Sequence, residues 1–299
     1  MKTLLALIKR NIKLFFKDKV LFFTSLVTPI ILLVLYSTFL AKVYKDVFAQ
    51  NMPEGTSDSI INAAVGGQLL SSLLSVCCVT VAFCSNMLMV HDKVTGARRD
   101  LTISPVKRST LAFAYYCSSL FSTLIICYTA TAACFIYIAC MGGYMSVADV
   151  FLILLDVLVL SLFGTALSSV IHFFLSSQGQ MSEVGTIISA GYGFICGAYM
   201  PISQYGKTLG HVMSFLPGTY GTSILRKHAL AGVFAEMETL GWPKGVLAEI
   251  KDAVDANFYF FGHSVSAGVM YAVLLGSVAA LLGAYILLQF FSARKRAKQ

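Results

Sequence analysis

The residue types that most often carry catalysis or bind metals are spread thinly along this chain of 299 residues. Cysteines are the largest group, and all eight fall in long apolar runs, at Cys77, Cys78, Cys84, Cys117, Cys127, Cys134, Cys140 and Cys196. No two of them have the Cys-x-x-Cys spacing of redox or zinc sites, and no histidine stands at metal-ligand spacing. We expect these cysteines to pack as small hydrophobic side chains.

One segment resembles a phosphate-binding loop but lacks its essential features. Gly206-Lys207-Thr208 matches the end of the pattern G-x-x-x-x-G-K-[ST], in which backbone N–H groups surround a phosphate. The pattern needs a glycine where Pro201 stands, and it must follow a strand. No other segment resembles a nucleotide site. The sequence therefore predicts that the chain is not itself an enzyme and binds no cofactor.

Composition indicates the environment of the elements that would hold any site. Hydrophobic residues make up 57% of the chain and charged residues 12%, with a mean hydropathy of +0.78. Soluble domains have about a quarter charged residues. We expect an all-α membrane protein, because helices satisfy their own backbone hydrogen bonds in lipid. At roughly 20 apolar residues per crossing, residues 21–299 are predicted to form one domain with six spans, at about 21–41, 63–90, 110–140, 147–175, 181–200 and 268–291.

Charge distinguishes the two faces of this domain. Six spans would put both termini and the 91–109 loop on one side, and residues 1–20, this loop and the tail after 291 carry six, five and four of the 22 Lys and Arg residues. Basic loops face the cytoplasm. Both termini of this multi-pass protein are therefore predicted to lie on the cytoplasmic side of the cell membrane. The net charge of +8 is then explained by topology, without a nucleic-acid partner.

Residues 1–20 are predicted to form an amphipathic helix in the membrane interface. Their apolar side chains recur at three- and four-residue steps, at Leu4, Leu5, Ile8, Ile12, Phe15 and Phe16. The alternative is a basic flank that only sets the topology.

The loop HDKVTGARRDLTISPVKRST, residues 91 to 110, is long and charged for a simple connection. It is predicted to contain a short helix, with Thr95 as its cap and an end at Ser104 and Pro105. A charged helix on the cytoplasmic face suits docking to another protein. The alternative is a solvated loop that obeys the charge rule.

Residues 201–220 combine apolar side chains with many helix breakers, among them Pro201, Gly206, Gly210 and Pro217. This mixture predicts a broken, re-entrant pair of short helices, which is tolerated at membrane depth when it is buried in protein or faces a water-filled cavity. A simple interfacial loop is the alternative. The extracellular loop that follows, 221–266, is long and contains a periodic apolar set, Val246, Leu247, Ile250 and Val254, that predicts an outer helix.

Two motifs together resemble the type-2 ATP-binding-cassette (ABC) exporter permeases. The first is acid-Lys-x-Thr-Gly followed by L-x-x-S-P-V-x-R, at residues 92–108. The second, at residues 197–230, has the order Met-Pro-Ile-Ser, Phe-Leu-Pro, Tyr220 and Leu225-Arg226. The family usually has Glu ahead of its loop motif and an acid soon after the Gly, where this chain has His91 and Arg98.

The resemblance implies a permease subunit that pairs with a second copy or a paralogous permease. Each subunit would bind a separate ABC ATP-binding subunit, which holds ATP and Mg, through a cytoplasmic coupling helix. The implied docking residues are Asp92, Lys93, Thr95, Gly96, Arg98, Arg99, Asp100 and Leu101. An outer gate is implied at the re-entrant residues Pro201, Phe215, Pro217 and Tyr220. The implied substrate is a hydrophobic or amphipathic small molecule, a peptide or a lipid-linked glycan.

The family's export pathway lies between two protomers, at the first, second and fifth spans. Candidate pathway residues are Phe22, Phe23, Phe83, Asn86, Asp156, Tyr192 and Tyr199. Asp156 joins this set because an acid deep in an apolar run is costly and usually functional; the alternative for it is a neutral, hydrogen-bonded structural acid. The aromatic residues could equally be core packing or lipid-facing.

The competing class is an ATPase-independent six-span channel or secondary carrier. A carrier needs charge pairs near the midplane, and Asp156 has no basic partner in any predicted span. Co-purification of an ATP-binding subunit would distinguish the two classes.

Overall fold

The computed structural model describes residues 2–53, 56–103 and 106–296. In chain order, its elements are α1 (Lys2–Lys17), α2 (Lys19–Leu35), η1 (Tyr36–Leu40), α3 (Ala41–Asn51), α4 (Asp58–Val94), α5 (Ala97–Ile103), α6 (Arg108–Met141), α7 (Val147–Phe174), α8 (Gln178–Ile195), η2 (Ile202–Gln204), α9 (Lys207–Ser214), α10 (Pro217–Ala229), α11 (Ala231–Thr239), α12 (Lys244–Ala253), β1 (Tyr259–Phe260), β2 (His263–Ser264) and α13 (Ala267–Arg296). η1 is a π-helical turn and η2 a 3-10 turn.

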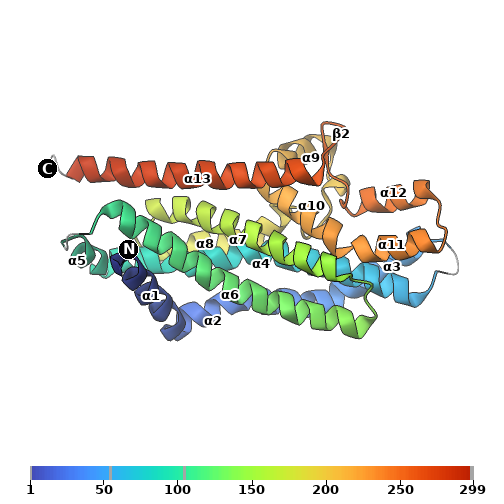
Figure 1. Ribbon diagram of the computed structural model, residues 1–299, viewed down its shortest axis with the longest axis horizontal. Helices are drawn as coiled ribbons and strands as arrows, with labels where there is room; N and C mark the ends of the chain where they lie inside the picture. Colours follow the sequence, from blue (N-terminus) through green and yellow to red (C-terminus); the bar gives the residue numbers. More distant parts are fainter. Residues whose placement is uncertain (1, 54–55, 104–105, 297–299) are drawn as a thin grey trace.

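The long helices run side by side along one axis, which makes the molecule elongated (Figure 1). Both termini lie at the same end as α5, and α3, α11 and α12 lie at the opposite end. We refer to these as the α5 end and the α12 end. The two short strands form an antiparallel hairpin on the α12 side of the molecule.

α4 is the central helix of the bundle. Nearly every residue in 60–90 is buried, and α2, α6, α7, α8 and α10 all pack against it. Its sequence explains this position, because small residues let neighbouring helices approach closely. A Cβ at Gly67 would lie 2.7 Å from the Ala229 carbonyl oxygen of α10, and a Cβ at Gly164 of α7 would lie 2.7 Å from the Cys78 carbonyl oxygen of α4.

Five helical segments among the described residues are long and apolar enough to cross a membrane, namely Lys19–Asp46, Asp58–Val94, Arg108–Cys140, Val147–Phe174 and Ala267–Phe291. They overlap five of the six spans expected from the sequence. The remaining expected span, 181–200, overlaps α8, which is not among the five. The protein is thus an all-helical membrane protein apart from its hairpin, and the count of six spans stays a prediction.

α1 lies against the bundle at the α5 end, where it packs mainly on α6. Its buried residues are Leu7, Asn11 and Phe15, spaced one helical turn apart, whereas Leu5 is 61% exposed. The face toward the bundle is therefore rotated from the apolar stripe expected from the sequence, and it includes a polar residue. Asp18 then caps α2, because its carboxylate accepts hydrogen bonds from the N–H groups of Val20 and Leu21.

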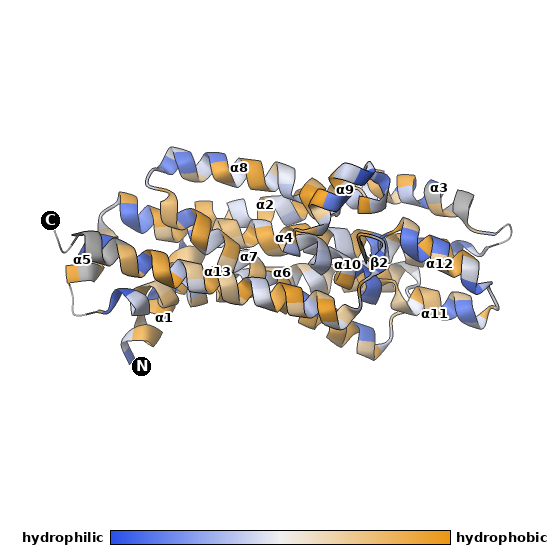
Figure 2. Cartoon of the chain, turned by 90° about the horizontal axis from the view of Figure 1, so that it is seen from above, coloured by the Kyte–Doolittle hydropathy of each residue, from blue (hydrophilic) through white to orange (hydrophobic). Residues whose placement is uncertain are grey.

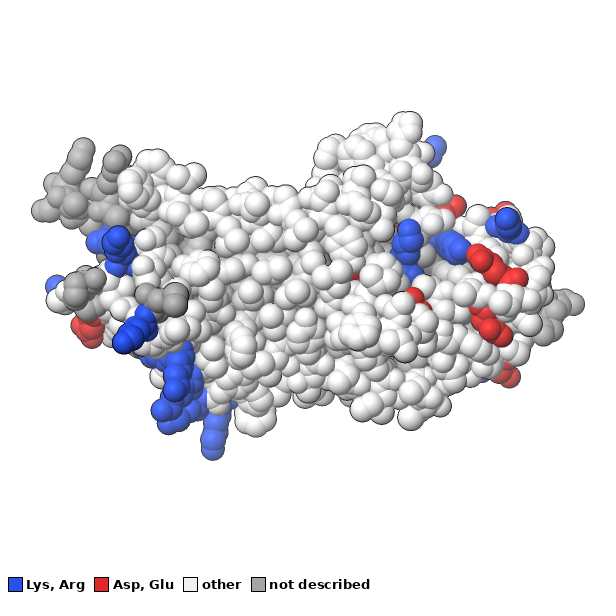
Figure 3. Space-filling model, in the orientation of Figure 1, with Lys and Arg blue, Asp and Glu red and all other residues white. Residues whose placement is uncertain are grey.

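Side chains are sorted by polarity along the axis. Orange, apolar residues dominate the middle of the bundle in Figure 2. On the face shown in Figure 3, Lys and Arg gather near the α5 end, acids and bases mix at the α12 end, and the surface between is almost free of charge. This sorting is typical of a helical bundle whose middle lies in hydrocarbon.

Candidate functional site

The segment expected to dock another protein lies at the extreme α5 end (Figure 1). α4 continues to Val94, and Gly96, with φ +85°, turns the chain into α5. The sequence predicted Thr95 as the cap of α5, and this prediction is wrong. The Thr95 hydroxyl donates to the His91 carbonyl at 2.9 Å, so Thr95 caps the end of α4 instead. The expected stop at 104–105 lies outside the described residues.

Asp92 is buried inside the protein rather than displayed on this segment. The Arg10 guanidinium of α1 donates to both of its carboxylate oxygens, at 2.7 and 3.2 Å, and the Tyr115 hydroxyl of α6 donates at 2.6 Å. The hydrogen bond to Asp92 raises the pKa of Arg10. Asp92 therefore joins α1 and α6 to the end of α4.

Lys93 is also used inside the fold. Its Nζ donates to the carbonyls of His172 at 2.9 Å, Phe173 at 2.7 Å and Leu175 at 2.9 Å, at the C-terminal end of α7. The Leu175 N–H also donates to the His172 carbonyl. A cation at the C-terminal end of a helix complements the helix dipole. Lys93 consequently ties the start of the α7–α8 turn to the end of α4.

The remaining docking candidates are divided between the protein and the surface. Arg98 donates to the Gln289 side chain of α13 at 2.9 Å, and Leu101 packs into the apolar cluster of α1 and α6. Arg99 and Asp100 are exposed, as is Ile103, at 77%. Among the α5 side chains that the structure describes, Arg99, Asp100 and Ile103 are the exposed ones.

Two of the candidate pathway residues lie one helical turn apart on α4, deep in the bundle. Asn86 donates to the hydroxyls of Ser168 and Ser169 of α7, at 2.9 and 2.8 Å, and its oxygen accepts from Ser119 of α6 at 3.1 Å. The Phe83 ring packs against the ring of His172, with centroids 5.4 Å apart. Within one protomer, this cluster joins α4 to α6 and α7.

The other aromatic candidates lie on α2, on α8 and in the bend that follows α8. Phe22 and Phe23 are near the start of α2, where Phe22 is half-buried and Phe23 is 62% exposed. Tyr192 of α8 is buried, and the half-buried Tyr199 packs over the backbone at Gly193, where a Cβ would lie 2.3 Å from the Tyr199 ring. These four side chains come from α2, α8 and the segment after α8, and not from α4.

Asp156 has partners that sequence analysis did not identify. His228, near the end of α10, lies 2.6 Å from one of its carboxylate oxygens through Nδ1, and the Tyr271 hydroxyl of α13 donates to the other oxygen. Asp156 itself is 2% exposed. The three side chains join α7, α10 and α13 at one point.

Arg226 of α10 is almost fully buried, at 1% exposed. Its guanidinium donates to the Gly197 carbonyl at 2.9 Å and lies 3.5 Å from the Asp255 carboxylate. Asp255 in turn accepts from the backbone N–H groups of Ile202 and Ser203. Burial raises the pKa of Asp255, and the charge of Arg226 acts in the opposite direction. This network links α10, the 197–203 segment and the end of α12.

The expected outer-gate residues lie in α10 or in the segment before it. Pro217 is the first residue of α10, and Tyr220 is buried with its ring 4.6 Å from that of Phe258. Phe215 is 64% exposed and contacts the hairpin at Phe260, with centroids 5.3 Å apart. Pro201 is buried where η2 begins. α10 itself lies within the bundle, against α4, α7 and α13.

Comparison with known families decides the identity of this arrangement. The model of the ABC-2 type transporter family matches residues 2–230, which run from α1 to the end of α10. The chain belongs to the ABC-2 type transporter family. A search of curated proteins found no match. As a member of this family, the protein is the membrane-embedded permease of an ABC transporter. α11, α12, the hairpin and α13 lie beyond the matched residues.

Several residues of this ABC-2 permease that hold its functional segments were not expected from the sequence, namely Arg10, Tyr115, His228, Tyr271 and Gln289. Asn11, beside Arg10, lies on the buried face of α1 with Leu7 and Phe15, which only the structure shows. Nothing local to Tyr271 or Gln289 points to a distant partner. Within residues 2–53, 56–103 and 106–296, no group of three His, Cys, Asp or Glu side chains could hold a metal ion.

Proposed function

We propose that this permease forms an export pathway as a dimer, and that a separate ABC ATP-binding subunit drives it by docking at the α5 end. ATP and Mg²⁺ bind to that subunit, and the permease contributes the pathway. Membership of the ABC-2 family supports this proposal. The transported substrate is a hydrophobic or amphipathic small molecule, peptide or lipid-linked glycan, because the bundle interior is mainly apolar.

The docking proposal rests on two observations, namely the exposed residues of α5 and the hydrogen bonds that fix α5 and the end of α4 to other helices. Arg99, Asp100 and Ile103 face outward at the tip of the molecule. Behind them, Arg98 of α5 is bonded to Gln289 of α13, and Asp92 and Lys93 at the end of α4 are bonded to α1, α6 and α7. Charge-assisted hydrogen bonds are strong, so α5 and the end of α4 move with the helices that hold them. A push on α5 would therefore reach α13 through Arg98, and α1, α6 and α7 through the end of α4.

The arrangement of ends supports six crossings with cytoplasmic termini in the cell membrane. Both termini lie at the α5 end, so the chain traverses the long axis an even number of times. Five helical segments qualify as spans by composition, and α8 supplies the sixth crossing. The gathering of Lys and Arg at the α5 end supports a cytoplasmic position for this end.

α8 supports the dimer. Its exposed residues include Ser182, Glu183, Thr186 and Ala190, which are small or polar. Polar side chains face the interior of a membrane assembly rather than lipid, and small residues let helices approach closely. A second permease copy that packs near α8 would cover this face. The pathway would then lie between the copies, near Phe22, Phe23, Tyr192 and Tyr199.

The proposal is tested by a detergent pull-down of the permease with its co-expressed ATP-binding subunit. The variant Arg99→Glu/Ile103→Asp changes the outward surface of α5. Lys13→Glu is a control on α1, because Lys13 is also exposed at the α5 end. We expect the wild-type chain and the Lys13→Glu control to retain the ATP-binding subunit and its stimulated ATPase activity, and the α5 variant to lose both.

Retention of the subunit by the α5 variant would contradict docking at α5. Failure of the wild-type chain to capture any ATP-binding subunit, together with transport that continues without ATP, would support an autonomous channel or carrier instead.

A further inference from the structure

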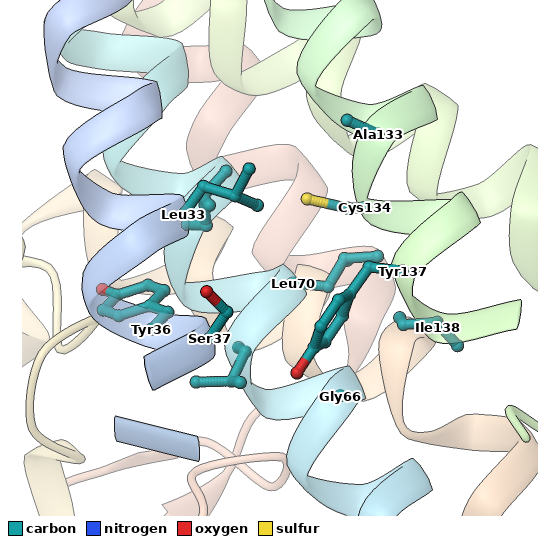
Figure 4. A pocket seen from close by; sticks show the side chains of 11 residues that line it. Leu33, Tyr36, Ser37, Gly66, Leu70, Ala133, Cys134, Tyr137 and Ile138 are labelled. Atoms are coloured by element: carbon teal, nitrogen blue, oxygen red, sulfur yellow. The ribbon is translucent and has the colours of Figure 1, made fainter. Parts of the chain in front are cut away.

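The permease has a well-formed apolar pocket between α2, α4 and α6, which the proposed docking and dimer surfaces do not use (Figure 4). Its volume is about 250 Å³. Its lining includes Leu33 from α2, Tyr36 from η1, Gly66 from α4, and Cys134, Tyr137 and Ile138 from α6. Figure 4 shows the side chains of Leu33, Cys134 and Tyr137 around the central space.

Local sequence features create this space. Gly66 adds no side chain to the α4 wall, which Leu69, Leu70 and Leu73 also line, and a Cβ at Gly66 would meet only the Ile138 side chain, at 3.3 Å. Ala133 and Cys134 keep the α6 wall thin. On the third wall, the helix changes to a π-helical turn at Tyr36–Leu40. Such turns insert one extra residue per turn, and they occur frequently at functional sites.

The pocket opens toward the lipid rather than toward water. Residues beside its mouth on α2 and α6 are exposed and apolar, with Val34 at 55% and Ile136 at 66%. Ser37, a polar residue of the η1 wall, already donates its hydroxyl to the Val34 carbonyl at 3.2 Å. An apolar cavity of about 150 Å³ in another protein stays dry and binds benzene. Hydrocarbon is therefore the natural occupant of a larger apolar pocket bordered by lipid.

A charged group suited to a lipid head lies farther along the same helix. Lys42 is exposed on α3, roughly 7 Å along the axis from Ser37 at the usual helical rise. Its neighbour Lys45 is paired with Asp58 at 3.1 Å. A phospholipid whose chain enters the pocket from the α12 side would bring its phosphate near Lys42, where opposite charges attract.

We propose that this pocket binds one acyl chain of a membrane phospholipid in the leaflet at the α12 end. The acyl chain fills the space between α2 and α6 next to Gly66, and the lipid phosphate lies beside Lys42. The bound lipid would hold α2 against α4 next to the π-helical turn. This site is independent of the proposed docking surface and of the transported substrate.

The site is tested by photo-crosslinking of the purified permease in vesicles of phosphatidylethanolamine and phosphatidylglycerol. The probe is phosphatidylcholine with a diazirine on one acyl chain, and peptide mass spectrometry locates the labels. We expect labels at 33–37 and 133–138 to exceed severalfold those on the exposed α13 face near Leu275. Ala133→Phe fills the pocket and should lower the pocket labels severalfold. Ala132→Phe, at an exposed neighbouring position that does not line the pocket, should leave them unchanged.

Gly66→Val fills the pocket from the α4 wall and must produce the same loss, and thermal unfolding in detergent checks the fold of each variant. The proposal is overturned if pocket labels equal those on α13, or if both filling variants leave them unchanged. Cross-links between two permease chains at these peptides would also overturn it, because a second copy would then cover the pocket.

Discussion

Asp92 and Lys93 are adjacent in the charged loop, yet both are used within the protomer. Asp92 receives hydrogen bonds from Arg10 and Tyr115, and Lys93 donates to three carbonyls of the α7 end. Neighbouring residues of a helix point in different directions, so each side chain reaches a different helix. Asp92 and Lys93 therefore fix the end of α4, which α5 follows, and Arg99, Asp100 and Ile103 are exposed on α5.

Replacing Lys93 by Met should destabilise the α5 end. The substitution keeps most of the apolar stem but leaves the carbonyls of the α7 end without their cation. Since hydrogen bonds to charged groups contribute roughly 1.5–3 kcal/mol, we expect a clear drop in the unfolding temperature of the purified permease. Lys107→Met, at an exposed position of the same end, should have little effect. Equal unfolding temperatures for the two variants would contradict the role of Lys93.

Replacing Arg226 by Leu should lower the stability of the folded protein more than Lys93→Met does, because it leaves the buried Asp255 carboxylate without its cation. Removing one partner of a buried ion pair typically costs roughly 3–5 kcal/mol. We expect reduced expression and a strongly lowered unfolding temperature. The exposed neighbour Lys227 supplies the control, since Lys227→Leu should change stability by only about 0.5 kcal/mol. A near-neutral Arg226→Leu variant would show that the network does not hold α10 in place.

At the scale of elements, α10 occupies a central position although it is too short to span a bilayer. It has 13 residues, of which the structure buries ten. It is held at one end by the Arg226 network and, near the same end, by the Asp156–His228 contact with α7. Close approach to α4 depends on Gly67, where the two backbones nearly touch. A broken helix is stable at this depth because the surrounding protein satisfies its polar groups.

Gly67→Ala should separate α10 from α4. The added Cβ would lie 2.7 Å from both the Ala229 carbonyl oxygen and the Leu230 side chain, and a backbone atom cannot move aside cheaply. Overpacking of this kind costs roughly 1–3 kcal/mol. Gly191→Ala in α8 meets nothing within 4 Å, and alanine favours a helix over glycine by about 1 kcal/mol. Thermal unfolding should therefore rank Gly191→Ala above Gly67→Ala, and the reverse order would refute the close contact.

At the scale of the whole molecule, the end that holds both termini is also the end where basic residues gather. Helix α5 lies at this same end. Beyond the family match, α11 and α12 lie at the other end, and α13 runs back along the bundle to the α5 end. Apolar residues dominate the middle of the bundle (Figure 2). This pattern supports the proposed orientation, in which the basic α5 end faces the cytoplasm.

Cysteine labelling in intact cells tests this orientation. Lys107 near α5 and Lys244 at the start of α12 are both exposed. A membrane-impermeant maleimide should label Lys244→Cys and leave Lys107→Cys unlabelled until the cells are permeabilised. The unmodified chain measures background from native cysteines such as the exposed Cys140. Labelling of Lys107→Cys in intact cells would mean that the α5 end faces outward.

Short-range patterns in the sequence determined the membrane class, the main apolar runs and the family, because hydropathy and motif spacing act over neighbouring residues. Asp92, Lys93 and Asp156 were recognised from these patterns as important. Their partners were not, since Arg10 is 82 residues from Asp92 and Tyr271 is 115 residues from Asp156. Only the tertiary structure decided that Thr95 caps α4 and that Gly66 opens a pocket. Such pairings and packing gaps depend on helices brought together by the fold, which no local pattern encodes.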